Sequence, residues 1–134
     1  MTAAERVWAR MSDLVLGRHD KRKEVSETLG LSFVKIKALR KLTSGSLTLG
    51  ELAERLGIDR PYATLVVDDL EQRGLVSRTV HPGDRRRKLV DVTPAGADLA
   101  ATAGRLLGEP PPALLALAAE ELAELERLLG KLGS

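Results

Sequence analysis

The stretch from Thr48 to Gly96 constrains the fold of this chain more than any other part of the sequence. It contains two short segments with helical periodicity, followed by two β-branched segments that flank the basic sequence HPGDRRRKL. Short amphipathic helices bury their apolar faces only by packing against neighbouring elements. The Pro-Gly pair in the basic sequence is typical of a tight turn. We therefore expect two packed helices followed by a β-hairpin with a positively charged tip.

The first of the two helices begins at a clear N-terminal signal. Thr48 and Glu51 have the T-x-x-E spacing of a capping box, in which each side chain accepts a hydrogen bond from the other residue's backbone amide. Gly57 is expected to end this helix after about two turns. Its apolar residues fall at i, i+3, i+4 and i+7, and they are Leu49, Leu52, Ala53 and Leu56.

The second helix repeats this spacing. Asp59 is its predicted N-cap, and Pro61 is tolerated in the first turn because no intrahelical amide is needed there. Gly74 closes the helix. Its inward face consists of Ala63, Val66, Val67 and Leu70. Two short helices with matched apolar stripes, separated by Gly57 and Ile58, predict a helix-turn-helix unit.

The hairpin and the flanking helices complete the expected architecture. Strands are predicted over Leu75–Val80 and Lys88–Val92, joined by the seven residues His81–Arg87, and Thr93–Pro94 should start another helix. Aromatic residues make up 2% of the 134 residues, so packing must rest on Leu, Val and Ala. The chain is therefore predicted to be a single, mainly α-helical domain with a small β-hairpin.

Further helices are expected on either side of this unit. A first helix should run from about Ala3 to Gly17, with a continuation toward Leu29 left open, and Gly30 should stop it. A second is expected over Ser32–Leu42, with Phe33, Ile36, Leu39 and Arg40 inward or near the inward face. After Pro110–Pro112 a single last helix should reach about Leu129. The helix after Thr93 is expected to bury Leu99, Ala103, Leu106 and Leu107.

Composition excludes several classes of function. The chain has no cysteine, which removes disulfides, thiolate metal sites and cysteine redox sensing. It has no apolar run long enough for a membrane helix and no secretory leader, so a cytoplasmic protein without membrane contact is expected. Basic residues outnumber acidic ones in residues 18–41 and 55–88, whereas the balance reverses after residue 108. This separation predicts a basic face for an anionic partner, with ordinary solvated helix faces as the alternative.

The outward face of the second helix is the first candidate site. Because the opposite face packs inward, Arg60, Tyr62, Thr64 and Leu65 are left to meet a partner. N-terminal residues of such a helix reach base edges in the major groove of duplex DNA. Arg60 suits guanine or phosphate, whereas Tyr62 and Thr64 suit a phosphate oxygen or a thymine methyl.

The same face also carries two acids, Asp68 and Asp69. They would repel phosphates, so the C-terminal half of this helix should tilt away from a DNA backbone. Alternatively, one of them pairs with a nearby arginine. The sequence leaves both interpretations open.

The hairpin tip is the second candidate site. Arg85, Arg86, Arg87 and Lys88 are four consecutive cations, and cations suit the negative potential of a narrow minor groove. Asp84 is expected to orient one of these arginines or to cap the turn. His81 is expected to touch phosphate. A solvated surface turn is the alternative interpretation.

From Leu31 to about residue 100 the chain resembles the multiple antibiotic resistance regulator (MarR) family. The resemblance lies in the order of elements and in three segments: LTLGELAERLGI, LVVDDLEQRGLV and HPGDRRRKLVDVTPAG. Its most specific parts are the D-x-R of Asp84 and Arg86 and the VTPAG of residues 92–96. One departure concerns the second helix, where the family often has Arg or Lys at the positions of Leu65 and Asp69. That helix should therefore make fewer phosphate contacts, or read a thymine methyl instead.

The resemblance implies a homodimeric, winged helix-turn-helix transcriptional regulator, of which a repressor is the expected case. Residues 31–93 would form the DNA-binding lobe, and residues 1–30 and 94–134 would form dimerisation helices. Arg85 or Arg86 would enter the minor groove, and Arg60, Tyr62 and Thr64 would face the major groove. Family members often bind small aromatic or anionic effectors between these two parts. Trp8, Met11 and Phe33 are candidates to line such a cleft, with dimer core as the alternative for Trp8.

The last helix supports dimerisation without the resemblance. Its main stripe consists of Leu115, Ala118, Leu122, Leu125 and Leu129, and further leucines lie off that stripe. This is more apolar surface than one small domain can cover, although deeper burial within the monomer is the alternative. A two-fold dimer would place its two recognition helices about 34 Å apart and would bind a pseudo-palindromic operator.

Catalytic and metal-binding interpretations have little support in the sequence. His19 and His81 lack neighbouring carboxylates at ligand spacing, so His19 is expected to be a solvated histidine and not a metal ligand. The chain contains no P-loop, no G-x-S-x-G and no H-E-x-x-H motif. We expect no catalytic residue, metal or cofactor. The alternative to a DNA-binding regulator is a winged-helix module that docks an acidic protein partner without specific DNA binding.

Overall fold

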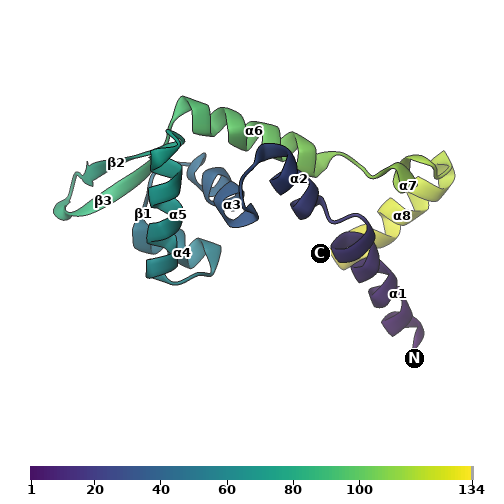
Figure 1. Cartoon of the computed structure of the whole chain (residues 1–134). Coiled ribbons are helices and arrows are strands. Elements are labelled where there is room, and N and C mark those ends of the chain that lie inside the picture. The colour runs from purple at the N-terminus through teal and green to yellow at the C-terminus, as the bar shows by residue number, and fades with distance from the viewer. Residues whose placement is uncertain (134) are drawn as a thin grey trace.

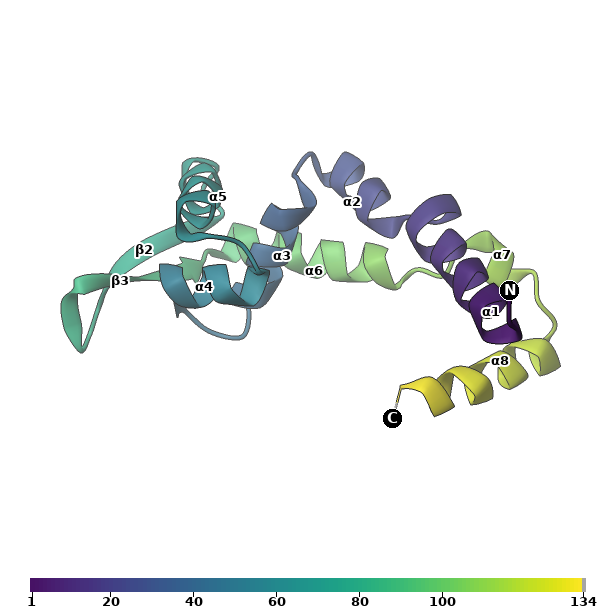
Figure 2. The same cartoon turned by 90° about the horizontal axis from the view of Figure 1, so that it is seen from below.

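The computed structural model describes residues 1–133 of the chain. The molecule is elongated, with a β-hairpin at one end and α1, α7 and α8 at the other (Figures 1 and 2). The helix α6 runs between these two ends. The elements in chain order are α1 (Ala3–Ser12), the π-helix η1 (Asp13–Arg18), α2 (Lys21–Leu29), α3 (Phe33–Leu42), β1 (Leu47–Thr48), α4 (Leu49–Leu56), α5 (Arg60–Gln72), β2 (Val76–His81), β3 (Asp84–Val92), α6 (Pro94–Gly108), α7 (Pro112–Leu115) and α8 (Ala119–Leu132).

The helix-turn-helix prediction is confirmed. The hydroxyl of Thr48 accepts a hydrogen bond from the Glu51 amide at 3.2 Å, and the Glu51 carboxylate accepts one from the Thr48 amide at 3.0 Å. Asp59 accepts from the amide of Tyr62 at 2.8 Å and starts α5. Gly57 has a φ of 68°, a conformation that glycine adopts without strain, and it reverses the chain between α4 and α5.

The core lies where α3, α4, α5 and α6 meet the sheet. The predicted apolar stripes of α4 and α5 are inward, and Leu52, Val67 and Leu70 have no exposed surface. Val90 of β3 is also buried, which ties the sheet to the helices. In α6 the buried residues are Gly96, Ala100 and Ala103, whereas Leu99, Leu106 and Leu107 are partly buried.

Within residues 1–133 the sheet has three antiparallel strands in the order β1-β3-β2. The short strand β1, which the sequence analysis missed, pairs Leu47 with Val90. The hairpin is also tighter than predicted, because His81 already pairs with Asp84 across Pro82 and Gly83. The predicted seven-residue loop is therefore wrong. The four cations of residues 85–88 lie in β3, where extended backbone points successive side chains to alternate faces.

One expectation for the flanking helices holds and two are corrected. The first helix passes through η1 and ends at Arg18, close to the expected Gly17, because Asp20 accepts the Arg22 amide at 3.1 Å and begins α2. The continuation toward Leu29, which the sequence left open, does not occur. Arg40 is exposed, not inward. The single helix expected after Pro110–Pro112 is split into α7 and α8, and the Glu121 carboxylate accepts the Ala118 amide at 2.9 Å where α8 starts.

A membrane-spanning segment is not found in the described part of the chain, residues 1–133: each helix there is too short or too polar to cross a bilayer.

Gly96, in the first turn of α6, packs directly against the end of the hairpin. A Cβ atom at this position would overlap the carbonyl oxygen of Leu75 and lie 2.7 Å from Cγ2 of Val92. Thr93 adds two contacts here, since its amide donates to the Leu75 carbonyl at 3.0 Å and its hydroxyl donates to the Gly74 carbonyl at 2.7 Å. The close packing of the sheet against α6 therefore requires a residue without a side chain, glycine, at position 96.

We expect Gly96→Ala to destabilise the protein by about 2–3 kcal/mol, because the new methyl meets backbone and cannot be accommodated by rotating a side chain. Gly104→Ala on the same helix is the matched control, since a Cβ there meets no atom within 4 Å. This control should be neutral or stabilising by up to about 1 kcal/mol through helix propensity. Urea denaturation of both variants measures the difference, and equal midpoints would contradict the assigned packing.

Candidate nucleic-acid interface

The structure places Arg60, Tyr62, Thr64 and Leu65 in the N-terminal half of α5. Ala63 and Val66 of the same turns are buried, so the helix offers its other side to solvent. Tyr62 is 47% exposed and Leu65 is 68% exposed. Thr64 is partly buried, and its hydroxyl donates to the Arg60 carbonyl at 3.0 Å.

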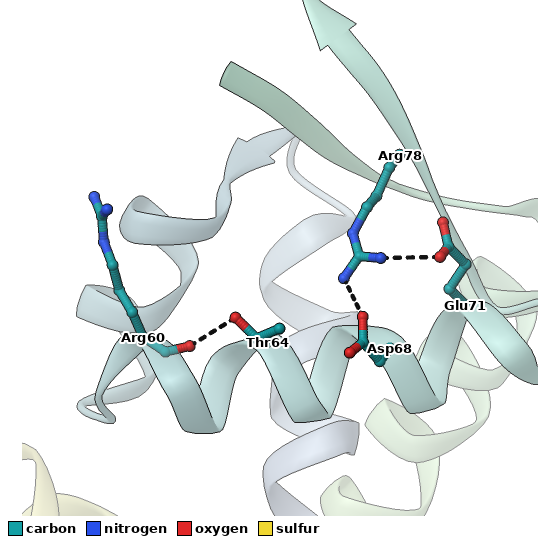
Figure 3. A network of polar contacts seen from close by, with 5 residues as sticks. All are labelled: Arg60, Thr64, Asp68, Glu71 and Arg78. Atoms are coloured by element: carbon teal, nitrogen blue, oxygen red, sulfur yellow. Dashed lines mark hydrogen bonds and ion pairs between the residues drawn. The ribbon is translucent and has the colours of Figure 1, made fainter. Parts of the chain in front are cut away.

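Arg60 extends from the first turn of α5 toward α4. A Cβ on Gly50 would lie 2.5 Å from a terminal nitrogen of Arg60, so the guanidinium group lies directly over this glycine. In Figure 3 its side chain projects from the N-terminal end of α5, away from Arg78. Gly50 thus makes room for Arg60 between the two helices, a role that the sequence analysis did not identify.

Arg78, also missed by the sequence analysis, joins the hairpin to α5. Its guanidinium group, on β2, donates to Asp68 at 2.6 Å and to Glu71 at 2.9 Å (Figure 3). Of the two interpretations of Asp68, the structure shows the arginine pair. The neighbouring acid, Asp69, bonds to Lys35 of α3 at 3.0 Å and to Arg73 at 2.7 Å.

These ion pairs change the electrostatics of α5. The hydrogen bond from Lys35, followed by that from Arg73, lowers the pKa of Asp69 below its usual value. Asp69 is therefore charged at neutral pH, but its single negative charge is matched by the neighbouring cations Lys35 and Arg73. The C-terminal half of α5, which contains Asp68, Asp69 and Glu71, consequently carries much less net negative charge than its sequence suggests.

The hairpin presents its cations around one ordered carboxylate. Asp84 accepts the Arg86 amide at 3.0 Å and the Arg86 Nε at 3.2 Å. The Arg86 side chain is nevertheless 90% exposed. His81 accepts the Gly83 amide on Nδ1 at 2.9 Å, so this ring nitrogen belongs to the turn. The geometry is the one expected for Asp84, which both caps the turn and orients an arginine.

The helix α5 and the hairpin together enclose an open hollow of about 470 Å³, which we call the cationic hollow. Its lining includes residues from α4, α5, β2 and β3. Its cationic lining residues come from three elements: Arg60 from α5, Arg78, which is held by its two acids, from β2, and Arg86, Arg87 and Lys88 from β3. Arg85 is exposed but does not line the hollow. Four cations around a groove of this size suit an anionic polymer.

The predicted effector residues are not brought together within one protomer. Phe33 lines an open cavity of about 850 Å³ between α3 and α6, beside Lys37, Arg40 and Arg55. Trp8 and Met11 do not line it. Trp8 is 69% exposed on α1, at the opposite end of the molecule from the hairpin (Figure 1). Within residues 1–133, no group of three or more His, Cys, Asp or Glu residues is placed to hold a metal ion.

Comparison with known proteins identifies the family. The model of the MarR family matches residues 31–88. Wild-type MarR from E. coli, solved in its apo form, is 26% identical with a TM-score of 0.71, and the match covers 98% of this chain and 97% of that chain. Residues 31–88 of this chain match the MarR family, and the chain as a whole has the winged-helix fold of its members. YusO from Bacillus subtilis is 25% identical with a TM-score of 0.76, over 99% of this chain and 98% of that chain.

The winged-helix fold extends to more distant members. MepR from S. aureus, solved as a complex with DNA, is 20% identical with a TM-score of 0.66, and the match covers 98% of this chain and 99% of that chain. The family and the fold class predicted from the sequence are thus confirmed. In this protein the hairpin of β2 and β3 is the wing, and α5 is the second helix of the helix-turn-helix.

The contacts of Asp84 predict how the wing responds to pH. Hydrogen bonds from the Arg86 amide, then from its side chain, lower the pKa of Asp84, so these contacts are present at neutral pH and are lost as the pH falls through that lowered pKa. In Arg86→Ala the pKa should rise toward its usual value but stay below it, since the amide of residue 86 still donates. Carboxyl ¹³C NMR titration measures this shift. Arg85→Ala is the control and should titrate like the wild type; an unchanged pKa in Arg86→Ala would contradict the contact.

Proposed function

We propose that this protein is a transcriptional regulator that binds a specific duplex DNA site as a homodimer. The observation that carries the proposal is the cationic hollow, which places Arg60 of α5 and Arg86, Arg87 and Lys88 of the wing around one groove. Duplex DNA offers two rows of phosphates separated by a major groove that admits an α-helix. The exposed N-terminal half of α5 is the part of this protein that fits such a groove.

In the proposed complex the wing and α5 bind different grooves of the DNA. The wing cations lie on an extended hairpin, and a narrow minor groove with its concentrated negative potential is the site that suits Arg86. Arg60, Tyr62, Thr64 and Leu65 face the major groove. MepR, which shares this fold, was solved bound to DNA, and this supports the same use of the wing and α5 here.

The other end of the molecule supports the homodimer. Within residues 1–133, none of the residues of α1, η1, α7 or α8 is buried. These four elements nevertheless carry many large apolar side chains, and a large exposed apolar surface is unfavourable in water unless another apolar surface covers it. Its exposed large apolar residues are Val7, Trp8, Leu14, Val15, Leu16, Leu115, Leu122, Leu128, Leu129 and Leu132. A second copy of this chain, meeting the first through these helices, is the proposed partner.

Two finer features complete the proposal. Repression is the expected sign of regulation, because a dimer bound across its operator obstructs transcription.

The cavity beside Phe33, with Lys37, Arg40 and Arg55, has the chemistry to take a small aromatic anion. An effector bound there would act by changing the relative position of the two α5 helices. Trp8 and Met11 would have to reach it from the partner protomer.

Substitution of Arg86 tests DNA binding. Arg86→Ala should weaken binding to the selected site and reduce the slope of log K against log salt by about one, because one cation that displaces a counterion from the DNA is lost. Arg105→Ala is the matched control, since it removes the same charge from the exposed side of α6. Fluorescence anisotropy over a range of salt concentrations gives both slopes.

The same titration separates the alternative function. A module that docks an acidic protein would bind all duplexes equally weakly and would show no preference for a selected site. Binding that is unchanged in Arg86→Ala, or that does not depend on salt, would contradict the wing assignment.

The oligomeric state tests the second half of the proposal. The full chain should have twice its monomer mass by light scattering, and Val15→Glu combined with Leu129→Glu should make it monomeric. Two charges in the apolar surface must be desolvated on association, which opposes pairing. Val80→Glu is the control, since Val80 is 56% exposed on the wing and should leave the dimer intact. A wild-type monomer at micromolar concentration would contradict the proposal.

A further inference from the structure

The side of α5 that faces away from the core has few hydrogen-bonding groups to offer. Pro61, Leu65 and Asp68 have the i, i+4, i+7 spacing of a single helical stripe, opposite the buried Ala63, Val66 and Val67. Pro61 and Leu65 are apolar. Asp68 already accepts a 2.6 Å hydrogen bond from Arg78, so its carboxylate is committed to the wing.

Two of the polar residues beside this stripe already have partners within the protein. The Thr64 hydroxyl donates to the Arg60 carbonyl, and Asp69 holds Lys35 and Arg73. Arg60 lies over Gly50 and lines the cationic hollow. In the N-terminal half of α5, the polar groups without a side-chain hydrogen bond among residues 1–133 are thus the Arg60 guanidinium and the Tyr62 hydroxyl, which both precede Leu65 in the sequence.

Leu65 is the group that protrudes from this surface. It is 68% exposed, and Tyr62, three residues earlier on the same side, is 47% exposed. Packing within the protomer does not account for a leucine at this position, whereas the four buried residues of α5 fill the core. A leucine at the centre of a cation-flanked helix face is complementary to a partner group that is apolar and lies between phosphates.

The floor of the major groove contains one apolar group that meets this requirement, the C5-methyl of thymine. We propose that Leu65 recognises a thymine methyl in each half-site, so that this protein selects its operator by an apolar contact at that position. The inference rests on the proposed DNA-binding function. Arg60 and the wing cations then hold the register through phosphates, and Leu65 supplies the discrimination between bases.

Deoxyuridine provides a direct test, because it lacks the C5-methyl but keeps the base pair of thymine. A site is first selected from random duplexes with the full chain, and each thymine is then replaced singly and in symmetric pairs. One replacement at the Leu65 position should weaken binding about four-fold, the value for one buried methyl group, and the symmetric pair about fifteen-fold. The other thymines should tolerate the replacement.

A double-mutant cycle assigns the contact to the side chain. Leu65→Ala should weaken binding to the thymine site and abolish the deoxyuridine penalty at that position, because the methyl has lost its partner. Val80→Ala is the matched control: it shortens another exposed apolar residue, and the penalty should persist. Thermal unfolding of both variants should match the wild type, since neither side chain is in the core.

The outcomes separate the two proposals. If the full chain selects no duplex, the proposed DNA-binding function fails, and this inference fails with it. If it selects a site in which every thymine tolerates deoxyuridine, DNA binding stands and the thymine contact is wrong. A deoxyuridine penalty that persists undiminished in Leu65→Ala would also overturn the role of Leu65, because another residue would then contact the methyl.

Discussion

Complete burial of one face of α5 is the constraint on which the rest of the site depends. Ala63, Val66, Val67 and Leu70 are each no more than 1% exposed, and burying a Val or Leu side chain contributes about 1.5–3 kcal/mol. These residues fix the rotation of α5 about its own axis. With that rotation fixed, Tyr62 and Leu65 must face solvent, Asp68 must face the wing, and Asp69 must face α3. The functional surface is therefore a consequence of core packing.

Ion pairs then adapt this surface to an anionic partner. Arg78 satisfies Asp68 and Glu71, whereas Lys35 and Arg73 satisfy Asp69. Exposed pairs of this kind contribute little to stability, typically up to about 1 kcal/mol. Their larger effect is on charge, because acids on the outer side of α5 would otherwise oppose the approach of phosphates. The pair on Arg78 also orients the wing relative to α5, so that cations from both elements meet in one hollow.

Local signals in the sequence were sufficient for most of the fold. The capping box of Thr48 and Glu51, the Asp59 cap and the matched apolar stripes each depend on residues within one or two turns, and the structure has all of them. The resemblance to the MarR family rested on the same segments. The strand β1 was missed because a two-residue strand has no periodicity and forms through its pairing with β3. The split of the last helix was missed because the leucine periodicity continues across the break at Ala116–Ala118.

The candidate site was predictable as a list of exposed residues but not as a set of contacts. The recognition-helix residues and the wing cations follow from periodicity and composition. The bonds of Arg78 to Asp68 and of Lys35 to Asp69 join residues far apart in the chain, so a local pattern does not reveal them. The position of Arg60 over Gly50 depends on how α4 meets α5. These nonlocal contacts determine which polar groups are already paired, and they leave Leu65 as the protruding group.

The two ends of the molecule are joined by α6, which gives the proposed dimer a simple geometric property. The N-terminus of α6 is held against the wing end by the contacts of Gly96 and Thr93 with Leu75, with no room for even a methyl group. Its C-terminus leads to α7 and α8, which carry the exposed apolar surface (Figure 2). A helix packed this tightly at one end transmits a change in tilt at the other as a rigid lever. In the proposed dimer, the separation of the two α5 helices therefore depends on how the α8 ends associate, and a ligand that favours one mode of association sets that separation.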